Sequence, residues 1–172
     1  HVDLLLDDDS CLRLRDPRRF GSVHWYDGPD EAQPLLADLG PEPMDRAFNG
    51  AYLYERARGR RRSVKEFIMD GRIVVGVGNI YAAEALFEAG IHPHRAAGRI
   101  SHRRHERLAA SIRSVIARAI EHGGTTLRDF TNTEGLPGYF RIALAVYGRA
   151  EQPCRRCGRT LRAARTGQRA TV

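Results

Sequence analysis

The stretch VVGVGNIYAAEALFEAGIHP, residues 74–93, constrains the fold of this chain more than any other segment. It combines an apolar approach, a Gly-x-Gly-Asn turn and a short helix that ends at Gly90, with Pro93 beyond it. The first free amides of a helix carry partial positive charge, and glycine lets an anion approach the backbone closely. The pattern therefore predicts an anion-binding site at Gly78 and Asn79.

A dinucleotide would be the obvious anion, but the fingerprint for one is incomplete. Its third glycine would fall at position 81, where this chain has Tyr81. It also requires a strand before the turn and an acidic residue after a second strand, whereas residues 94–122 favour helix. We therefore expect a different anion.

The rest of the sequence predicts an α+β chain. Alternating or β-rich runs separated by the turns DDDS and DPRR predict a small antiparallel meander over residues 2–6, 11–15 and 20–26. A proline-containing connection follows over residues 27–47, with a short helix expected near EAQPLLADL, residues 31–39.

Helices dominate the middle of the chain, and short strands are expected at its end. We expect helices over residues 49–58 and 63–70, and a long one from a Ser101 cap to Gly123. Residues 141–172 suggest short strands around a Cys-x-x-Cys turn. The apolar side chains of the long helix recur with i, i+4, i+7 spacing and are Leu108, Ile112, Val115, Ile116, Ala119 and Ile120.

Composition excludes several classes of protein. A chain of 172 residues with 42% hydrophobic residues can bury a core and is not a disordered tail. No apolar run is long enough to span a bilayer, and HVDLLLDDDSC does not predict a signal peptide. Three unequally spaced cysteines make no disulfide framework, so we expect an intracellular protein.

The placement of charge indicates a polyanionic partner. The chain carries a net charge of +7, and residues 141–172 hold eight arginines and one acid. Residues 1–30, in contrast, hold seven aspartates against four arginines. A solvated basic tail or an arginine-rich genome would explain arginine in place of lysine, but not the missing acids, so the distribution favours a nucleic acid.

Cys154 and Cys157, in CRRCG, have the spacing of half a zinc knuckle. Tetrahedral zinc takes four ligands, and no cysteine or histidine follows Cys157 in this sequence. A truncated zinc ribbon, a redox pair and a metal-free turn remain as interpretations, of which we favour the truncated ribbon.

Two further basic motifs fit a nucleic-acid partner. DPRRFG, residues 16–21, places two arginines and Phe20 at a turn, where arginine forks suit phosphates and a ring can wedge between bases. The alternative is a Phe20 that packs back into the sheet. GRRRS, residues 59–63, is either a solvated face or a phosphate contact through Arg60 or Arg61. Lys65 is the only lysine, and an inert surface position is the simpler interpretation.

Taken in order, these blocks resemble the formamidopyrimidine-DNA glycosylase family, which also includes endonuclease VIII. The resemblance covers essentially the whole chain, and VGVGNIYAAEALF and GGTTLRDF are its most specific blocks. DPRRFG points to the formamidopyrimidine branch.

The resemblance implies three parts. Residues 1–40 would be the last strands of a β-sandwich catalytic domain, residues 41–140 a helix-two-turn-helix DNA-binding domain and residues 141–172 a partial zinc-finger hairpin. The first residue, His1, falls inside what would be the end of the catalytic domain, so the chain looks like an interior fragment. The family's N-terminal proline amine and the glutamate after it are absent, and we expect this chain alone to be inactive.

The resemblance also implies roles for individual residues. Arg18 and Phe20 match the loop that fills the gap left by a flipped nucleotide, and Thr131–Phe140 matches a cover over the flipped base. Arg169 would hold a phosphate and assist the second elimination step, as a catalytic residue. The other implied DNA contacts are Arg19 and Arg60 on the backbone, Lys65 near the lesion pocket, and Gly78 and Asn79 on a phosphate.

The function that follows from the resemblance is DNA repair. The parent protein would excise oxidised purines from damaged duplex DNA and cut the abasic strand by β,δ-elimination, with zinc as cofactor, held here by the half-site of Cys154 and Cys157. The alternative is a non-catalytic damaged-DNA-binding module, and a weaker one is a ribosome-associated RNA binder. We further expect a monomer in the bacterial cytoplasm, at the nucleoid, with no membrane contact.

Overall fold

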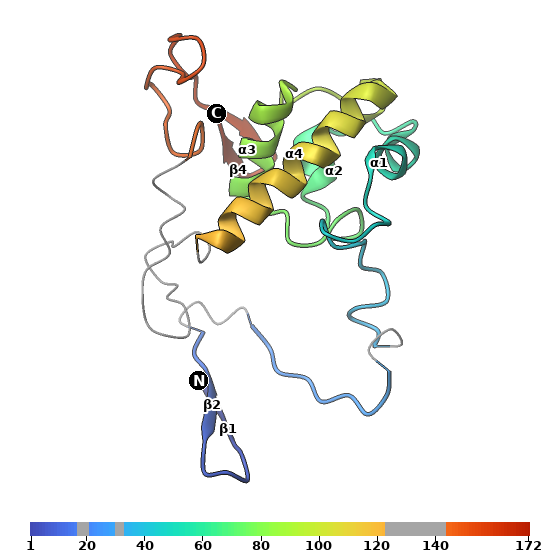
Figure 1. The fold of residues 1–172 in the computed structure, drawn as a ribbon, viewed down its shortest axis with the longest axis vertical. Coiled ribbons are helices and arrows are strands. Elements are labelled where there is room, and N and C mark those ends of the chain that lie inside the picture. Colours follow the sequence, from blue (N-terminus) through green and yellow to red (C-terminus); the bar gives the residue numbers. More distant parts are fainter. Residues whose placement is uncertain (17–20, 30–32, 123–143) are drawn as a thin grey trace. The chain divides into compact units, whose positions relative to one another are not determined.

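The computed structural model describes residues 1–16, 21–29, 33–122 and 144–172 (Figure 1). By its internal contacts the chain divides into two compact units, His1–Ala37 and Asp38–Val172. Among the described residues, no helix is both long and apolar enough to cross a membrane.

The first unit is built on one antiparallel hairpin. β1 (Val2–Leu5) pairs with β2 (Cys11–Leu14), with Val2 opposite Leu14 and Leu5 opposite Cys11. The third strand predicted over residues 20–26 is wrong for residues 21–26, which form no strand. Alternation favours a strand only where one face is buried, and Trp25 is 92% exposed.

The helix predicted near residues 31–39 is also wrong for the described residues 33–38. The amides of Leu36 and Ala37 both donate to the carbonyl of Gln33, which makes one turn and no more. Leu35 and Leu36 are exposed, so no apolar face is buried to stabilise a longer helix.

The second unit contains the predicted helices, and most of its core lies among them. α1 (Gly50–Ala57) and α3 (Asn79–Ala89) both pack on α4 (His102–Glu121), while α2 (Val64–Ile68) packs on α3. A one-turn 3-10 helix, η2 (Ala97–Arg99), precedes α4.

Local signals delimit each of the three shorter helices, whereas Ser101, the predicted cap of α4, makes no capping hydrogen bond through its side chain within the described residues. The side chains of Asn49 and Ser63 accept hydrogen bonds from the first turns of α1 and α2, and Gly90 ends α3 in the left-handed conformation. Gly50 is required for packing, because a Cβ there would lie 2.3 Å from the Cα of Glu106 on α4. The helix predictions for residues 49–58, 63–70 and 79–89 are therefore confirmed.

The predicted apolar face of α4 is confirmed for most of its length. Leu108, Ile112, Val115 and Ala119 are buried, and Ile116 packs partly against the core. Ile120, which has the same spacing, is 67% exposed, although Ala119 beside it is buried.

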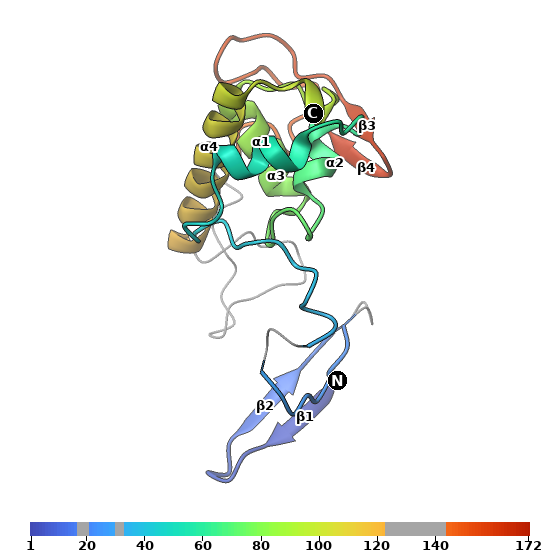
Figure 2. The ribbon, with the colours of Figure 1, turned by 90° about the vertical axis from the view of Figure 1, so that its right-hand side faces the viewer.

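The end of the chain forms the expected strands. β3 (Ala164–Thr166) pairs with β4 (Arg169–Thr171), and the bridge between Pro153 and Thr160 flanks the Cys-x-x-Cys turn. The β3–β4 hairpin lies beside α2 and α3 (Figures 1 and 2). The α+β class is confirmed, whereas the β-sandwich and the zinc finger stay predictions.

Candidate nucleic-acid interface

The interface begins with Lys65, which the first turn of α2 directs inward. Ser63 caps this helix by accepting a hydrogen bond from the amide of Glu66, and its hydroxyl donates to the Glu66 carboxylate. The side chains of Val64 and Phe67 enter the core beside Lys65, which is fully buried. Lys65 is therefore not the inert surface lysine that the sequence alone favoured.

The ammonium group of Lys65 is held by neutral oxygens. Its Nζ donates to the carbonyl of Ala170 at 3.0 Å and to Oγ1 of Thr171 at 2.8 Å, and Thr171 in turn donates to Oγ1 of Thr166. Burial, and secondarily repulsion from Arg169, lowers the pKa of Lys65 to about 8. In the described part of the chain, no carboxylate forms an ion pair with it.

Asn79 brings the start of α3 to the same carbonyl. Its Nδ2 donates to the Ala170 oxygen at 3.2 Å, while its Oδ1 is buried and has no hydrogen-bond partner in the described part of the chain. Gly78, the residue before the helix, has open space where a Cβ would be. The side chain of Asn79 thus binds the hairpin, and the backbone amides of Asn79 and Ile80 remain as donors for an anion.

Arg169 supplies a second cation at this place. It is exposed on β4, and among the residues described it forms no ion pair. With Gly167 at the hairpin tip and Glu66 on α2, it lines a pocket of about 290 Å³.

The other carboxylate in that pocket is already neutralised. Asp70 accepts from Arg62 at 2.9 Å and from Arg72 at 3.2 Å. Hydrogen bonding from Arg72, assisted by Arg62, holds the pKa of Asp70 well below its usual range. Asp70 therefore forms no ion pair with Arg169 or Lys65, and the Glu66 carboxylate accepts its side-chain hydrogen bond from the Ser63 hydroxyl.

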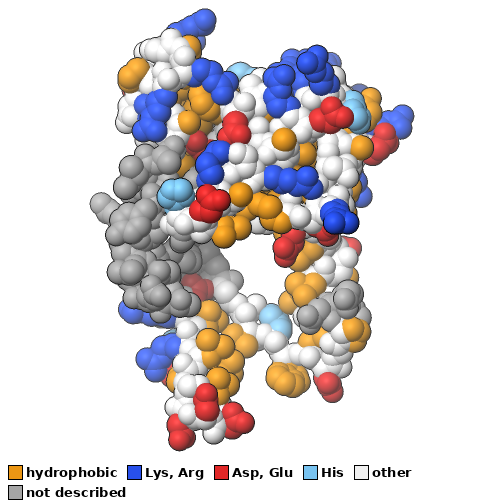
Figure 3. Space-filling view, in the orientation of Figure 1, with side chains coloured by type: hydrophobic (Ala, Val, Ile, Leu, Met, Phe, Trp, Pro, Cys, Tyr) orange, Lys and Arg blue, Asp and Glu red, His pale blue; other side chains and the backbone are white. Residues whose placement is uncertain are grey.

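Of the remaining predicted DNA contacts, Arg60 is the one that the structure describes, and it does not line the pocket at Arg169. Arg60 is exposed in the connection between α1 and α2, where its backbone bonds to Ala57 and Gly98. Arg18, Arg19 and Phe20 lie outside the described residues, as does the segment Thr131–Phe140. In Figure 3, basic side chains are spread over the visible face of the second unit.

Cys154 and Cys157 form the turn expected of a metal knuckle. The amide of Arg156 donates to Sγ of Cys154 at 3.4 Å, the amide of Gly158 donates to the carbonyl of Cys154, and Gly158 has a positive φ of 74°. Hydrogen bonding from the backbone amides of Arg156 and Cys157 lowers the pKa of the Cys154 thiol, which suits a thiolate ligand. The residues fit half of a tetrahedral zinc site, because no third ligand lies with them within the described ranges.

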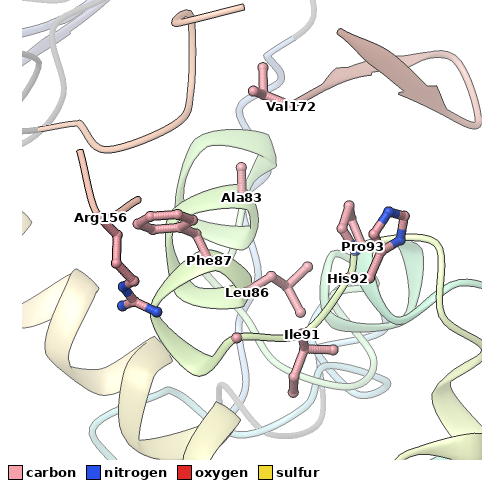
Figure 4. A pocket seen from close by; sticks show the side chains of 9 residues that line it. Ala83, Leu86, Phe87, Ile91, His92, Pro93, Arg156 and Val172 are labelled. Carbon is pink, nitrogen blue, oxygen red and sulfur yellow. The ribbon is translucent and has the colours of Figure 1, made fainter. Parts of the chain in front are cut away.

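The knuckle touches α3 through a cation–π contact that the sequence did not predict. The guanidinium of Arg156 lies 4.9 Å from the ring centroid of Phe87 (Figure 4). Both residues line an apolar pocket of about 320 Å³, which contains none of the predicted DNA contacts.

Glu84 is the other residue that sequence reasoning missed. It is an acid on the buried face of α3, 7% exposed, and it accepts the backbone amides of residues 145–147. A carboxylate among the alanines of AAEALFEA was the available signal, since a buried acid requires partners.

Comparisons with known proteins agree on one family. The family model described as "Formamidopyrimidine-DNA glycosylase H2TH domain" matches residues 39–131, which is more than half of the chain. A formamidopyrimidine-DNA glycosylase from Alkalilimnicola ehrlichii is 63% identical over 99% of this chain. Another, from Methylococcus capsulatus, is 60% identical over 99%. The chain spans only 62% and 63% of the length of these two relatives.

Solved structures show the same likeness. The crystal structure of the MutM (Fpg) protein from Thermus thermophilus matches with a TM-score of 0.89 and 40% identity, over 98% of this chain and 64% of that one. The complex between Lactococcus lactis Fpg and abasic-site DNA matches with a TM-score of 0.75 and 29% identity, over 83% of this chain and 53% of that one.

Proposed function

Because this chain belongs to the formamidopyrimidine-DNA glycosylase family, we propose that it binds damaged or abasic duplex DNA through the cluster of Lys65, Asn79 and Arg169. One observation carries the proposal: two cations that form no ion pair with any carboxylate of the described residues lie beside the amide end of α3. A backbone phosphate would supply the missing negative charge and accept hydrogen bonds from the backbone amides of Asn79 and Ile80. The Lactococcus lactis relative was solved with abasic DNA, which supports this choice of partner.

The residues of the cluster would divide the work. Arg169 is exposed, and its guanidinium can donate two parallel hydrogen bonds to two phosphate oxygens. The backbone amides that follow Gly78 would donate to a third oxygen. Lys65 contributes its charge from beneath and fixes the Ala170 carbonyl, which keeps β4 against α3. Arg19 and Arg60 would add backbone contacts, and Arg18 and Phe20 would occupy the gap left by a flipped nucleotide.

Since the chain spans less than two thirds of its relatives, we propose the enzymatic activity for the whole protein. It would be a bifunctional glycosylase and lyase that excises oxidised purines, such as formamidopyrimidine and 8-oxoguanine, and cleaves the abasic strand by β,δ-elimination. Arg169 assists the second elimination by holding the phosphate that leaves. The protein would act as a monomer in the bacterial cytoplasm, at the nucleoid.

Zinc belongs to this proposal as a structural cross-link. Cys154 and Cys157 would hold it as two of four ligands, and the bound ion would stabilise the hairpin that carries Arg169. The hydrogen bonds from the backbone amides of Arg156 and Gly158 to Cys154 form the turn without the ion. Zinc would therefore affect how firmly the hairpin is held and take no part in the chemistry.

A non-catalytic damaged-DNA-binding module is the second candidate, and one observation favours it. The only lysine of the chain is buried and hydrogen-bonded, so its amine is not free to attack a sugar. Borohydride trapping on an abasic duplex separates the candidates for this chain. An efficient covalent adduct would exclude the purely binding role.

Direct titration tests the proposed binding. The 172-residue chain should bind an abasic duplex more tightly than an intact duplex, and either more tightly than double-stranded RNA of the same length. Fluorescence anisotropy with three labelled oligonucleotides at one salt concentration measures this order. Equal affinity for all three, or preference for RNA, would refute the assignment.

A further inference from the structure

The buried carboxylate of Glu84 has an unusual set of partners. Its Oε1 accepts the amides of Val146 and Tyr147 at 2.9 and 2.8 Å, and its Oε2 accepts the amide of Ala145 at 2.7 Å. No basic side chain pairs with it in the described residues. Three consecutive N–H groups therefore converge on one carboxylate, in the manner of a backbone anion nest.

The same short segment is held from its other side by Arg149. The guanidinium donates to the carbonyl of Ala145 at 2.7 Å and to the carbonyl of Pro153 at 2.9 Å. Ala145 is thus bonded through its N–H to Glu84 and through its C=O to Arg149. We call these hydrogen bonds of Glu84 and Arg149 to residues 145–147 and 153 the joint. Pro153 directly precedes Cys154, so the joint connects α3 to the Cys-x-x-Cys knuckle.

The joint and the DNA-binding cluster lie on the same helix. Asn79, at the start of α3, binds the carbonyl of Ala170, and Glu84 follows it about one and a half turns later. The C-terminal segment is consequently hydrogen-bonded to α3 at two places, residues 145–147 and residue 170, and the contact of Arg156 with Phe87 is a third attachment. A segment attached at two points of one rigid helix has a fixed position along it.

We propose that Glu84 is a positioning residue for DNA binding: it fixes the segment that leads to the β3–β4 hairpin, so that Arg169 faces the amide end of α3. The inference rests on the proposed function, since it assigns Glu84 a role in the binding that Arg169 performs. Arg149 acts in the same joint from the carbonyl side.

Glu84→Gln is the informative variant, because it keeps the shape and removes one acceptor. The amide nitrogen of glutamine faces at least one backbone N–H, so that hydrogen bond is lost and two donors oppose each other. The affinity for an abasic duplex should fall about tenfold, a loss on the scale of one charged hydrogen bond. The slope of log affinity against log salt should become flatter by about one unit, although Arg169 is still present.

Glu88→Gln is the matched control on the same helix. Glu88 pairs at the surface with Arg118 at 2.8 Å and touches neither the joint nor the cluster. Its substitution should leave the affinity and the salt slope unchanged. Amide hydrogen exchange adds a readout without DNA: residues 145–147 should lose protection in Glu84→Gln while the amides of α4 keep theirs.

A double-mutant cycle with Arg169→Ala decides between positioning and general stability. If Glu84 positions Arg169, Arg169→Ala should cost little further affinity in the Glu84→Gln background. Full additivity, or a Glu84→Gln protein with the affinity and salt slope of the unmodified chain, overturns the positioning role and leaves the proposed function standing. Failure of the unmodified chain to bind abasic duplex overturns both. Should Glu84→Gln not fold, Glu84→Asp, which shortens the reach to the three amides, is measured in the same cycle.

Discussion

At the scale of single residues, the environment of Lys65 is unusual for a cation. Its ammonium is fully buried, its partners are a carbonyl and a hydroxyl, and Arg169 adds repulsion. A negative charge brought close to such a cation stabilises its charged form. A nearby phosphate would stabilise the protonated form, so DNA binding and protonation of Lys65 should be linked.

The linkage predicts a pH-dependent affinity. The pKa of Lys65 is about 8 in the free chain, so raising the pH from about 7 to about 9 removes its charge before DNA binds. The affinity for an abasic duplex should fall about tenfold over this range, because the proton must then be taken up on binding. Anisotropy titrations across this range measure it. Lys65→Met is the control and should give a flat profile; a flat profile for the unmodified chain would contradict the assignment.

His105 predicts a pH dependence of stability that is separate from DNA. The ring is fully buried on α4 and packs edge-on against Tyr54, and its nitrogens have no hydrogen-bond partner among the described residues. Burial lowers its pKa, so below pH 6.5 the unfolded chain takes up a proton that the folded chain does not. The free energy of unfolding should therefore fall as the pH drops below about 6.5, by up to about 1.4 kcal/mol per pH unit.

Urea unfolding at pH values of about 7.5, 6.5 and 5.5 measures this effect. His94→Gln, at an exposed histidine, is the control variant. His105→Leu should remove the slope on the acid side of this range. An unchanged slope in His105→Leu would place the dependence elsewhere.

At the scale of elements, the sequence predicted well where the signal is local. The caps at Asn49 and Ser63 and the left-handed Gly90 act within one helical turn, and the helices they delimit are present. The predictions near residues 20–26 and 31–39 were wrong for the described residues. A strand or a short helix also requires an apolar face that is buried against another element. A local sequence pattern does not indicate whether such an element packs against that face.

The two units should consequently differ in local stability. No hydrophobic side chain is buried among the described residues of 1–37, whereas the helices of the second unit surround a core. A lone two-stranded hairpin is marginally stable in water. Hydrogen exchange should be complete within seconds for β1 and β2, while amides in the middle of α4 exchange orders of magnitude more slowly. Comparable protection in β1, β2 and α4 would contradict this expectation.

At the scale of the whole molecule, the candidate site is made by contacts that join distant parts of the chain. Lys65 and Ala170 are 105 positions apart, and Asn79 and Ala170 are 91 apart. The Gly-x-Gly-Asn turn indicated an anion site, and the family resemblance indicated Lys65 and Arg169. Neither the turn nor the resemblance indicated that the Ala170 carbonyl of β4 joins Lys65 and Asn79, or that Glu84 holds the segment before the hairpin. These contacts follow from tertiary packing.

The salt dependence of DNA binding tests the central claim, that Arg169 and the amide end of α3 share one backbone phosphate. The affinity of the chain for an abasic duplex is titrated at several salt concentrations, alongside Arg169→Ala and Arg165→Ala. Arg165 is an exposed arginine on β3 of the same hairpin, so it controls for net charge. Arg169→Ala should weaken binding and flatten the slope of log affinity against log salt by about one unit, with the slope unchanged in Arg165→Ala. Equal slopes for Arg169→Ala and the unmodified chain would contradict the account.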